Sequence, residues 1–227
     1  MKLLSVNVSL PKEVPHERKT VSTSIYKEPV DGRVMLRTMN LDGDGQADLE
    51  NHGGVYQAAY VYSVENYDHW RRELGRYCLA FGQFGENFTV EGRAEDDIYI
   101  GDVFGVGDAL VEVTQPRTPC FKLGIKMGMP EFPKMFLSSG RVGFYLRVLR
   151  EGEVGAGDAF ERIEECPERV SVQEMSRLLF FEPENLEGAK RALRVRALSP
   201  GWRNSFENRL AKAGEDQDNA AEKESSG

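Results

Sequence analysis

The sequence predicts a mainly β fold with added α structure: a β-barrel body over residues 1–168 and a small three-helix bundle over residues 169–214. Short β-like runs separated by Gly-Asp steps fill the first part, and helical periodicity begins at Val170. The segment 215–227 is rich in Asp, Glu, Ser and Gly, which predicts a disordered acidic tail. A chain of 227 residues is long enough to bury a full core in this arrangement.

The strand signals begin near the N-terminus, where Leu4, Val6, Val8 and Leu10 share one face of an extended run. Pro11 ends this run. Further β-like runs follow at residues 21–26, 34–39, 98–100, 103–106, 110–114 and 144–149.

Helices are predicted at two places within the body. The clearer one begins after Ser63, places Tyr67 and Trp70 on its apolar face and ends at Gly75. A shorter helix is expected within residues 130–139.

The C-terminal region has three helix starts. Ser171 and Glu174 have the spacing of a capping box. Pro183 predicts the start of a second helix and Pro200 the start of a third, in which Trp202 and Phe206 lie on one face. These three helices form the predicted bundle.

Composition and charge exclude several classes of protein. The formal net charge is −8, and residues 1–168 alone carry −8, so the body has no overall field that would attract nucleic acid. Residues 169–214 carry +4, which leaves nucleic-acid or partner docking open for that segment alone. No apolar run approaches the roughly 18 residues of a membrane helix. Three widely spaced cysteines predict neither a CxxC zinc site nor a disulfide framework, and they favour a reducing, cytoplasmic location.

Cys120 lies in the sharpest local motif, QPRTPCFK at residues 115–122. Its two prolines keep the backbone extended after a strong strand, and Arg117 and Lys122 flank the cysteine. Nearby cations favour the thiolate, which is both a nucleophile and a metal ligand. The spacing alone also suits a small buried apolar side chain, as most free cysteines are.

Two further segments are candidates for ligand contact. His52 is followed by Gly53 and Gly54, where the backbone permits close approach of a ligand, although a structural histidine in a tight turn fits equally well. The segment GENF at residues 85–88 can expose Asn87, or it can be an ordinary β-turn.

These motifs occur together and in a fixed order: LDGDGQAD at 41–48, HGG at 52–54, GENF at 85–88, IGDVF at 100–104 and QPRTPC at 115–120. In this combination the chain resembles the MOSC domain family, named for the C-terminal domain of molybdenum-cofactor sulfurases. The resemblance is greatest to its YiiM-type members, in which a three-helix domain follows the MOSC domain. It covers roughly residues 1–212.

The resemblance implies a MOSC-type β-barrel with an open pocket and a functional cysteine at Cys120, as a ligand to molybdenum or as a sulfur carrier. Relatives with a molybdopterin cofactor reduce N-hydroxylated compounds, and YiiM-type proteins are associated with resistance to 6-hydroxylaminopurine. The leading hypothesis is therefore a molybdenum-cofactor oxidoreductase acting on such compounds. The alternative is a sulfur carrier with a Cys120 persulfide and no metal.

Under the leading hypothesis, Cys120 is the metal ligand, and the residues expected to hold the cofactor are Lys27, Asn87, Arg117, Thr118, Gly53 and Gly54. Asp48 and His52 are expected to orient the pocket or to deliver a proton. The sequence has neither a flavin fingerprint nor an iron–sulfur pattern, so the electrons are expected from a separate donor protein.

Overall fold

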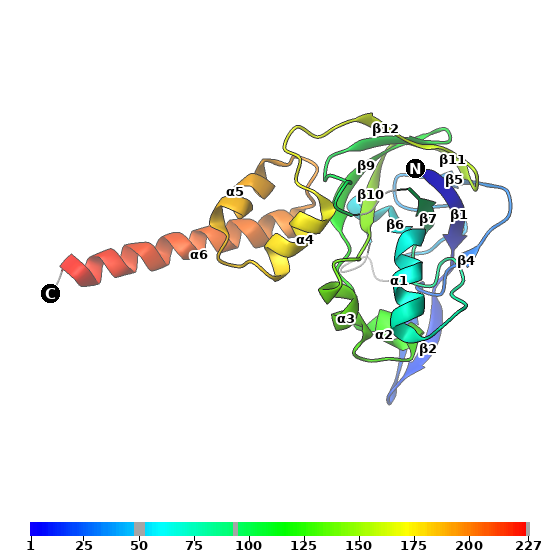
Figure 1. Cartoon of the computed structure of the whole chain (residues 1–227), viewed down its shortest axis with the longest axis horizontal. Coiled ribbons are helices and arrows are strands. Elements are labelled where there is room, and N and C mark those ends of the chain that lie inside the picture. The colour runs from blue at the N-terminus through cyan, green and yellow to red at the C-terminus, as the bar shows by residue number, and fades with distance from the viewer. Residues whose placement is uncertain (48–52, 93–94, 226–227) are drawn as a thin grey trace.

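The computed structural model describes residues 1–47, 53–92 and 95–225. Its main element is an eight-stranded curved sheet, with the helices α4–α6 at one end of the molecule (Figure 1). The strands follow one another in the sheet as β12 (Phe160–Glu164), β8 (Val103–Val106), β9 (Ala109–Pro116), β10 (Phe144–Arg150), β6 (Ala59–Ser63), β7 (Phe88–Glu91), β1 (Lys2–Val8) and β4 (Glu28–Pro29).

The predicted β-barrel is confirmed only in part: the strands form a curved sheet, but this sheet is not closed, because it has two ends, β12 and β4. The outer edge of β1 is divided between two partners. Its first residues exchange backbone hydrogen bonds with residues 157–160, among them Leu3 N–H to Asp158 O at 2.9 Å, and its last two residues pair with β4. Since no single described strand runs along the whole of this edge, the sheet curls without closing.

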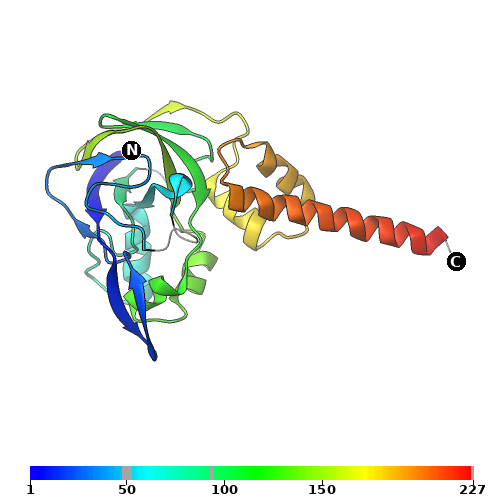
Figure 2. The same ribbon diagram turned by 180° about the vertical axis from the view of Figure 1, so that it is seen from behind.

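Two small sheets accompany the main one. β11 (Gly152–Gly155) pairs with β5 (Arg33–Leu36). β2 (Lys12–His16) and β3 (Lys19–Thr23) form a hairpin that projects from the body in both ribbon views (Figures 1 and 2). The sequence signals missed β2, because this strand is mostly polar, follows Pro11 and contains Pro15.

The helix predicted between Ser63 and Gly75 is confirmed as α1 (Val64–Leu74), which connects the parallel strands β6 and β7. Gly75 ends it at φ 60° and donates its N–H to the carbonyls of Arg71 and Arg72. α1 packs with α2 (Phe121–Met127) and α3 (Phe132–Ser138) around a second core, in which aromatic rings predominate. Its buried residues are Tyr60, Tyr62, Tyr67, Trp70, Leu79, Phe84, Leu123, Met127, Phe132, Phe136 and Val142.

The C-terminal region forms α4 (Val172–Phe180), α5 (Leu186–Arg194) and α6 (Pro200–Ser225). The serine half of the predicted capping box is confirmed, since the Ser171 hydroxyl accepts a hydrogen bond from Glu174 N–H at 3.1 Å, whereas the Glu174 carboxylate pairs with Arg191. α5 begins at Leu186 and not at Pro183, because the Asn185 side chain caps it by accepting from Gly188 N–H at 2.8 Å.

The helices do not form a core separate from the sheet. Val170, Met175 and Phe206 belong to the same buried cluster as Val111 and Val113 of β9. Backbone hydrogen bonds also join the two regions, from Ile100 N–H to Val170 O at 3.0 Å and from Val172 N–H to Ile98 O at 2.8 Å. The helical region therefore completes the apolar core of the sheet.

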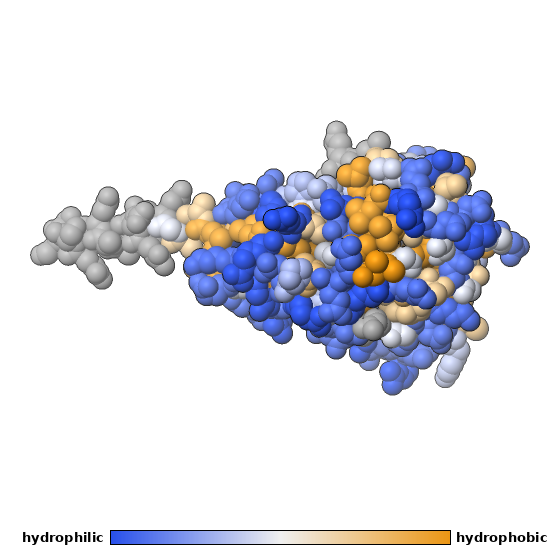
Figure 3. Space-filling model, turned by 90° about the horizontal axis from the view of Figure 1, so that it is seen from above, coloured by the Kyte–Doolittle hydropathy of each residue, from blue (hydrophilic) through white to orange (hydrophobic). Residues whose placement is uncertain are grey.

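Where the composition predicts a disordered tail over 215–227, α6 continues through Ser225 and extends beyond the other helices (Figure 2). Glu, Gln, Ala and Lys are good helix formers, and they make up much of this segment. Among the described residues, no helix combines the length and the apolar character needed to cross a bilayer. Seen from above, most of the surface is hydrophilic, with an apolar stripe across the sheet-rich body (Figure 3).

Candidate functional site

Two adjoining hollows meet at Cys120. The first is a cavity of about 120 Å³ between the end of β9, the segment 23–27 and the loop 44–47. The second is wider, about 810 Å³, and lies between the segment 53–57 and the start of α6. Four residues line both hollows: Gln57, Thr118, Cys120 and Tyr145.

The chain brings Cys120 to this junction through β9, which ends at Pro116. Cys120 is half-buried and extended (φ −117°, ψ 172°), and its carbonyl accepts from Leu123 N–H at 3.0 Å as α2 begins. The sequence signals missed α2, because it has only seven residues and contains Gly124. The Arg117 guanidinium lies close enough to interact electrostatically with Cys120. Cys78 and Cys166 line neither hollow.

Arg117 places a positive charge inside the first cavity. Its side chain is buried, one of its guanidinium nitrogens donates to Phe84 O, and its guanidinium carbon lies 4.5 Å from the centre of the Tyr60 ring. A guanidinium remains protonated at every pH at which proteins are folded. The cavity thus keeps a fixed cation beside Cys120.

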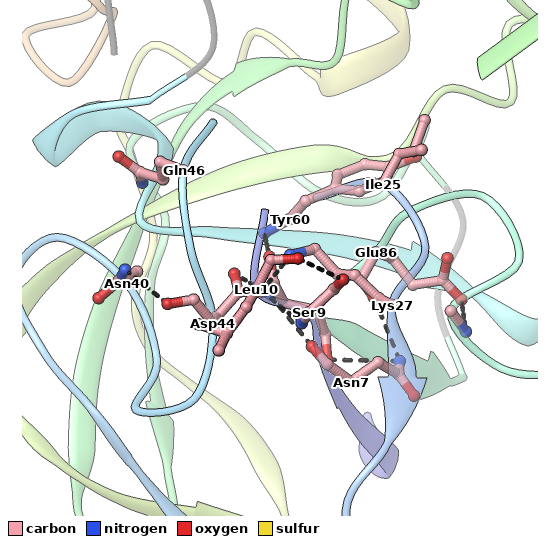
Figure 4. Close-up of polar contacts among 12 residues, drawn as sticks. Asn7, Ser9, Leu10, Ile25, Lys27, Asn40, Asp44, Gln46, Tyr60 and Glu86 are labelled. Carbon is pink, nitrogen blue, oxygen red and sulfur yellow. Dashed lines mark hydrogen bonds and ion pairs between the residues drawn. The ribbon is translucent and has the colours of Figure 1, made fainter. Parts of the chain in front are cut away.

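Lys27 and Asp44 form a buried ion pair on the same cavity wall (Figure 4). Lys27 Nζ lies 2.5 Å from Asp44 Oδ1, which also accepts from Ser9 N–H at 2.8 Å. Burial lowers the pKa of Lys27, although the attraction to Asp44 opposes this shift. The ion pair fixes the position of the lysine at the cavity.

Asn87 holds this pair in place. Its amide nitrogen donates to Asp44 Oδ2 at 2.9 Å and to Asn7 O at 3.2 Å, and its side-chain oxygen accepts from Tyr60 N–H at 3.1 Å. Both amide hydrogens therefore have acceptors within the protein. The structure gives Asn87 a positioning role at the cavity, and donation to a cofactor remains a prediction.

Glu86 organises the loop that precedes β7, and the sequence reasoning did not single it out. It is fully buried, and its carboxylate accepts from Gly82 N–H at 2.8 Å, Phe84 N–H at 3.0 Å and Thr89 Oγ1 at 3.0 Å, and also from the Tyr67 hydroxyl. These hydrogen bonds fix the carboxylate beneath the cavity and hold the loop 82–86 around it. The carboxylate offsets the positive charges around the cavity.

Lys126 carries one of these positive charges, and no pattern in the sequence indicated its role either. Its ammonium donates to Ile25 O at 2.8 Å and to Gly82 O at 2.5 Å, which ties the cavity wall to the loop before β7. Burial lowers the pKa of Lys126 from its ordinary 10.5 to about 8. The positive charges of Arg117, Lys27 and Lys12 add to this shift, and Glu86 opposes it.

This depressed pKa predicts a pH-dependent stability. The unfolded chain binds the Lys126 proton more tightly than the folded chain, so the free energy of unfolding should rise with pH between about 8 and 10.5. The Lys126→Met variant should lack this contribution, so wild type should gain up to about 3 kcal/mol relative to it across that range. Urea titrations of both proteins at pH 7.5 and 10.5 measure the difference. A stability difference that does not change with pH contradicts the assignment.

The other predicted site residues lie at the junction or outside the described chain. Thr118 is exposed and lines both hollows, whereas Gly53 and Gly54 line the wider one. Gly54 has φ 87°, a conformation that favours glycine, and a Cβ there would meet nothing within 4 Å. Asp48 and His52 fall outside the described residues.

The sequence signals missed the aromatic lining and the helical wall. Tyr60 and Tyr145 are directly paired across β6 and β10, with ring centres 5.3 Å apart, and no local motif indicates this pairing. The segment 199–202 lines the wider hollow, although it is far from Cys120 in the sequence. Across the described residues, no three His, Cys, Asp or Glu side chains gather as a metal-ligand group.

Comparison with known proteins identifies the family. The MOSC domain model matches residues 48–161, and the model of the YiiM-like, 3-alpha helix domain matches residues 170–213. The uncharacterized protein YflK of Bacillus subtilis is 42% identical over 204 residues, which cover 90% of this chain and 92% of YflK. Protein YiiM of Escherichia coli is 33% identical over 189 residues, which cover 82% of this chain and 84% of YiiM.

A solved structure and a more distant relative add to this assignment. The crystal structure of YiiM from Geobacillus stearothermophilus superposes with a TM-score of 0.78 at 33% identity, covering 92% of this chain and 98% of that one. A protein named Reductase from Gibberella moniliformis is 32% identical over 162 residues, which cover 70% of this chain and 29% of that protein. This chain therefore belongs to the MOSC domain family and carries a C-terminal domain of the YiiM-like three-helix type.

Proposed function

We propose that this protein binds the molybdenum cofactor in the charged cavity and reduces N-hydroxylated compounds such as 6-hydroxylaminopurine, with the Cys120 sulfur as a ligand to molybdenum. The observation that carries this proposal is the position of Cys120, half-buried where a cation-lined cavity meets a wide hollow. The distant relative named Reductase supports an oxidoreductase.

The donor set of the cavity suits the cofactor. Its pterin carries a phosphate dianion, and the described cavity lining contains three cations, Lys27, Arg117 and Lys122, against one carboxylate, Asp44. A thiolate at Cys120 is a ligand type that molybdenum accepts. Thr118 provides a hydroxyl at the same junction, and Gly53 and Gly54 leave the wider side open to a bulky group.

When bound, the cofactor supplies a metal centre that exchanges two electrons. The overall reaction is R–NH–OH + 2 H⁺ + 2 e⁻ → R–NH₂ + H₂O, in which the N–O bond breaks and the electrons come from a separate donor protein. The chain's own residues hold the phosphate, fix Cys120 and exclude bulk water. We assign proton delivery to Asp48 or His52, and we place the activity in the cytoplasm, where thiols stay reduced.

The test compares full-length protein made in cells that synthesise molybdopterin with protein from cells that cannot. We expect near-equimolar molybdenum and pterin in the first preparation only, together with reduction of 6-hydroxylaminopurine driven by reduced methyl viologen. Protein without molybdenum but with cyanide-labile sulfur on Cys120 would establish the alternative, a sulfur carrier. Protein with neither molybdenum nor cyanide-labile sulfur would contradict both the reductase and the sulfur-carrier function.

Arg117→Met should weaken cofactor retention. The change keeps much of the side-chain volume but removes the charge, and a charge-assisted contact to phosphate contributes about 1.5–3 kcal/mol, or roughly a tenfold or greater loss of affinity. Pterin fluorescence after oxidation measures occupancy, and thermal melting checks the fold. Arg150→Met, at an exposed position on β10, is the control and should keep full occupancy. Equal occupancy in both variants would remove Arg117 from the binding site.

A further inference from the structure

The wide hollow beside Cys120 is built from two regions of the chain. Tyr56, Phe121 and Tyr145 of the MOSC region line one part of it, and Ser199–Trp202, where α6 begins, line another. Trp202 is held by its neighbours, since its side chain is 6% exposed and its ring meets Phe180 edge-on at 5.7 Å. The start of α6 is therefore a rigid wall.

The two hollows differ in charge. The smaller cavity contains Lys27, Asp44, Arg117 and Lys122, whereas none of the described residues that line the wider hollow carries a charged side chain. Four aromatic residues line the wider hollow instead. Such a lining suits a planar aromatic molecule, because aromatic rings contact a planar ligand over a large area.

We propose that the start of α6, Ser199–Trp202, forms one wall of the substrate site, so that the three-helix domain sets which N-hydroxylated molecules reach Cys120. This inference rests on the proposed function, and it deepens that function by assigning one wall of the substrate site to the C-terminal helices. The charged cavity holds the phosphate of the cofactor, and the wide hollow receives the substrate beside Cys120.

Gly201 allows a direct test of this wall. It lines the hollow, and a Cβ at this position would meet nothing within 4 Å, so Gly201→Phe starts a larger side chain where no neighbour crowds its Cβ. Gly214 lies on the same helix with equally open surroundings but does not line the hollow, so Gly214→Phe is the matched control. Gly201→Leu provides a smaller second variant, and thermal melting verifies that each protein is folded.

The first measurement uses the loaded, full-length enzyme with a planar aromatic substrate, 6-hydroxylaminopurine, and a small one, N-methylhydroxylamine. Gly201→Phe should lower kcat/KM for the purine roughly tenfold or more, about the factor that a poorly fitting group costs in a binding pocket. It should leave the value for the small substrate and the molybdenum content unchanged. Equal loss with both substrates, or loss with neither, overturns the proposal.

The second measurement does not depend on turnover. In metal-free protein, Gly201→Phe should slow alkylation of Cys120 by an N-aryl maleimide and leave alkylation by iodoacetamide at the wild-type rate, as located by peptide mapping. Gly214→Phe should match wild type with both reagents. If wild type contains no molybdenum or reduces neither substrate, the proposed function fails, and this alkylation ratio alone decides whether α6 forms the wall.

Discussion

Replacing Cys120 with serine should abolish reduction of 6-hydroxylaminopurine and strip molybdenum from the protein, while the fold remains intact. Serine is nearly the same size, but its hydroxyl does not ionise near neutral pH and is a poor replacement for a thiolate ligand. Losing a partner that merely supports a metal ligand costs about 10–100-fold, so loss of the ligand itself should exceed roughly 100-fold in activity.

The measurement is turnover with reduced methyl viologen, together with molybdenum per protein. Cys78→Ser is the control, because Cys78 is exposed and lines neither hollow. A folded Cys120→Ser protein that retains molybdenum and wild-type turnover would make Cys120 a packing residue and would remove the basis of the proposed function.

The second large effect is on stability. Glu86→Ala should lower the free energy of unfolding by about 3–5 kcal/mol, because each buried donor left without its acceptor costs about 1–3 kcal/mol. The loss leaves Gly82 N–H, Phe84 N–H and the Tyr67 hydroxyl without their carboxylate acceptor. It also leaves nearby Lys126 without its counter-charge. Because the loop before β7 carries Asn87, cofactor occupancy should fall as well.

Urea unfolding followed by tryptophan fluorescence measures the change. Glu73→Ala, at an exposed position on α1, is the control and should stay within about 0.5 kcal/mol of wild type, as surface substitutions usually do. Glu86→Gln keeps the side-chain size and one of the two acceptor oxygens. Its free energy of unfolding should therefore lie between those of Glu86→Ala and Glu73→Ala. A Glu86→Ala protein as stable as the control would contradict the role assigned to this carboxylate.

The elements that could be predicted from the sequence are those with local signals. α1 was predictable from its apolar face and from Gly75, and the start of α4 from Ser171 and Glu174, because each signal lies within a few residues. α2 was not predictable, because seven residues with an internal glycine give too little periodicity.

Sheet closure depends on pairing between distant segments, which no local pattern encodes. A run of short strands predicts a barrel, but β1 shares its outer edge between residues 157–160 and β4, so the sheet stays open. The continuous core between β9 and the C-terminal helices was missed for the same reason.

Within the candidate site, the predicted residues Cys120 and Arg117 come from one local motif, and the structure brings them together with Lys27 and Asn87 in the lining of one cavity. Glu86 and Lys126 were missed because their importance comes from burial, not from spacing. Glutamate and lysine are common on protein surfaces, so the sequence gives no reason to expect them in the interior. The fold shows that both are enclosed and that both bind Gly82, Glu86 through its N–H and Lys126 through its carbonyl.

The core that β9 shares with α4 and α6 has a consequence for how such proteins recombine. The two family regions meet between residues 161 and 170, yet Val111 and Val113 pack in one cluster with Met175 and Phe206 across that boundary. A chimera that joins this MOSC domain to another relative's helices therefore inherits mismatched packing unless the facing residues of β9 are exchanged with them. The same continuity predicts that the chain unfolds as one cooperative unit, so calorimetry should record a single transition and not one for each domain.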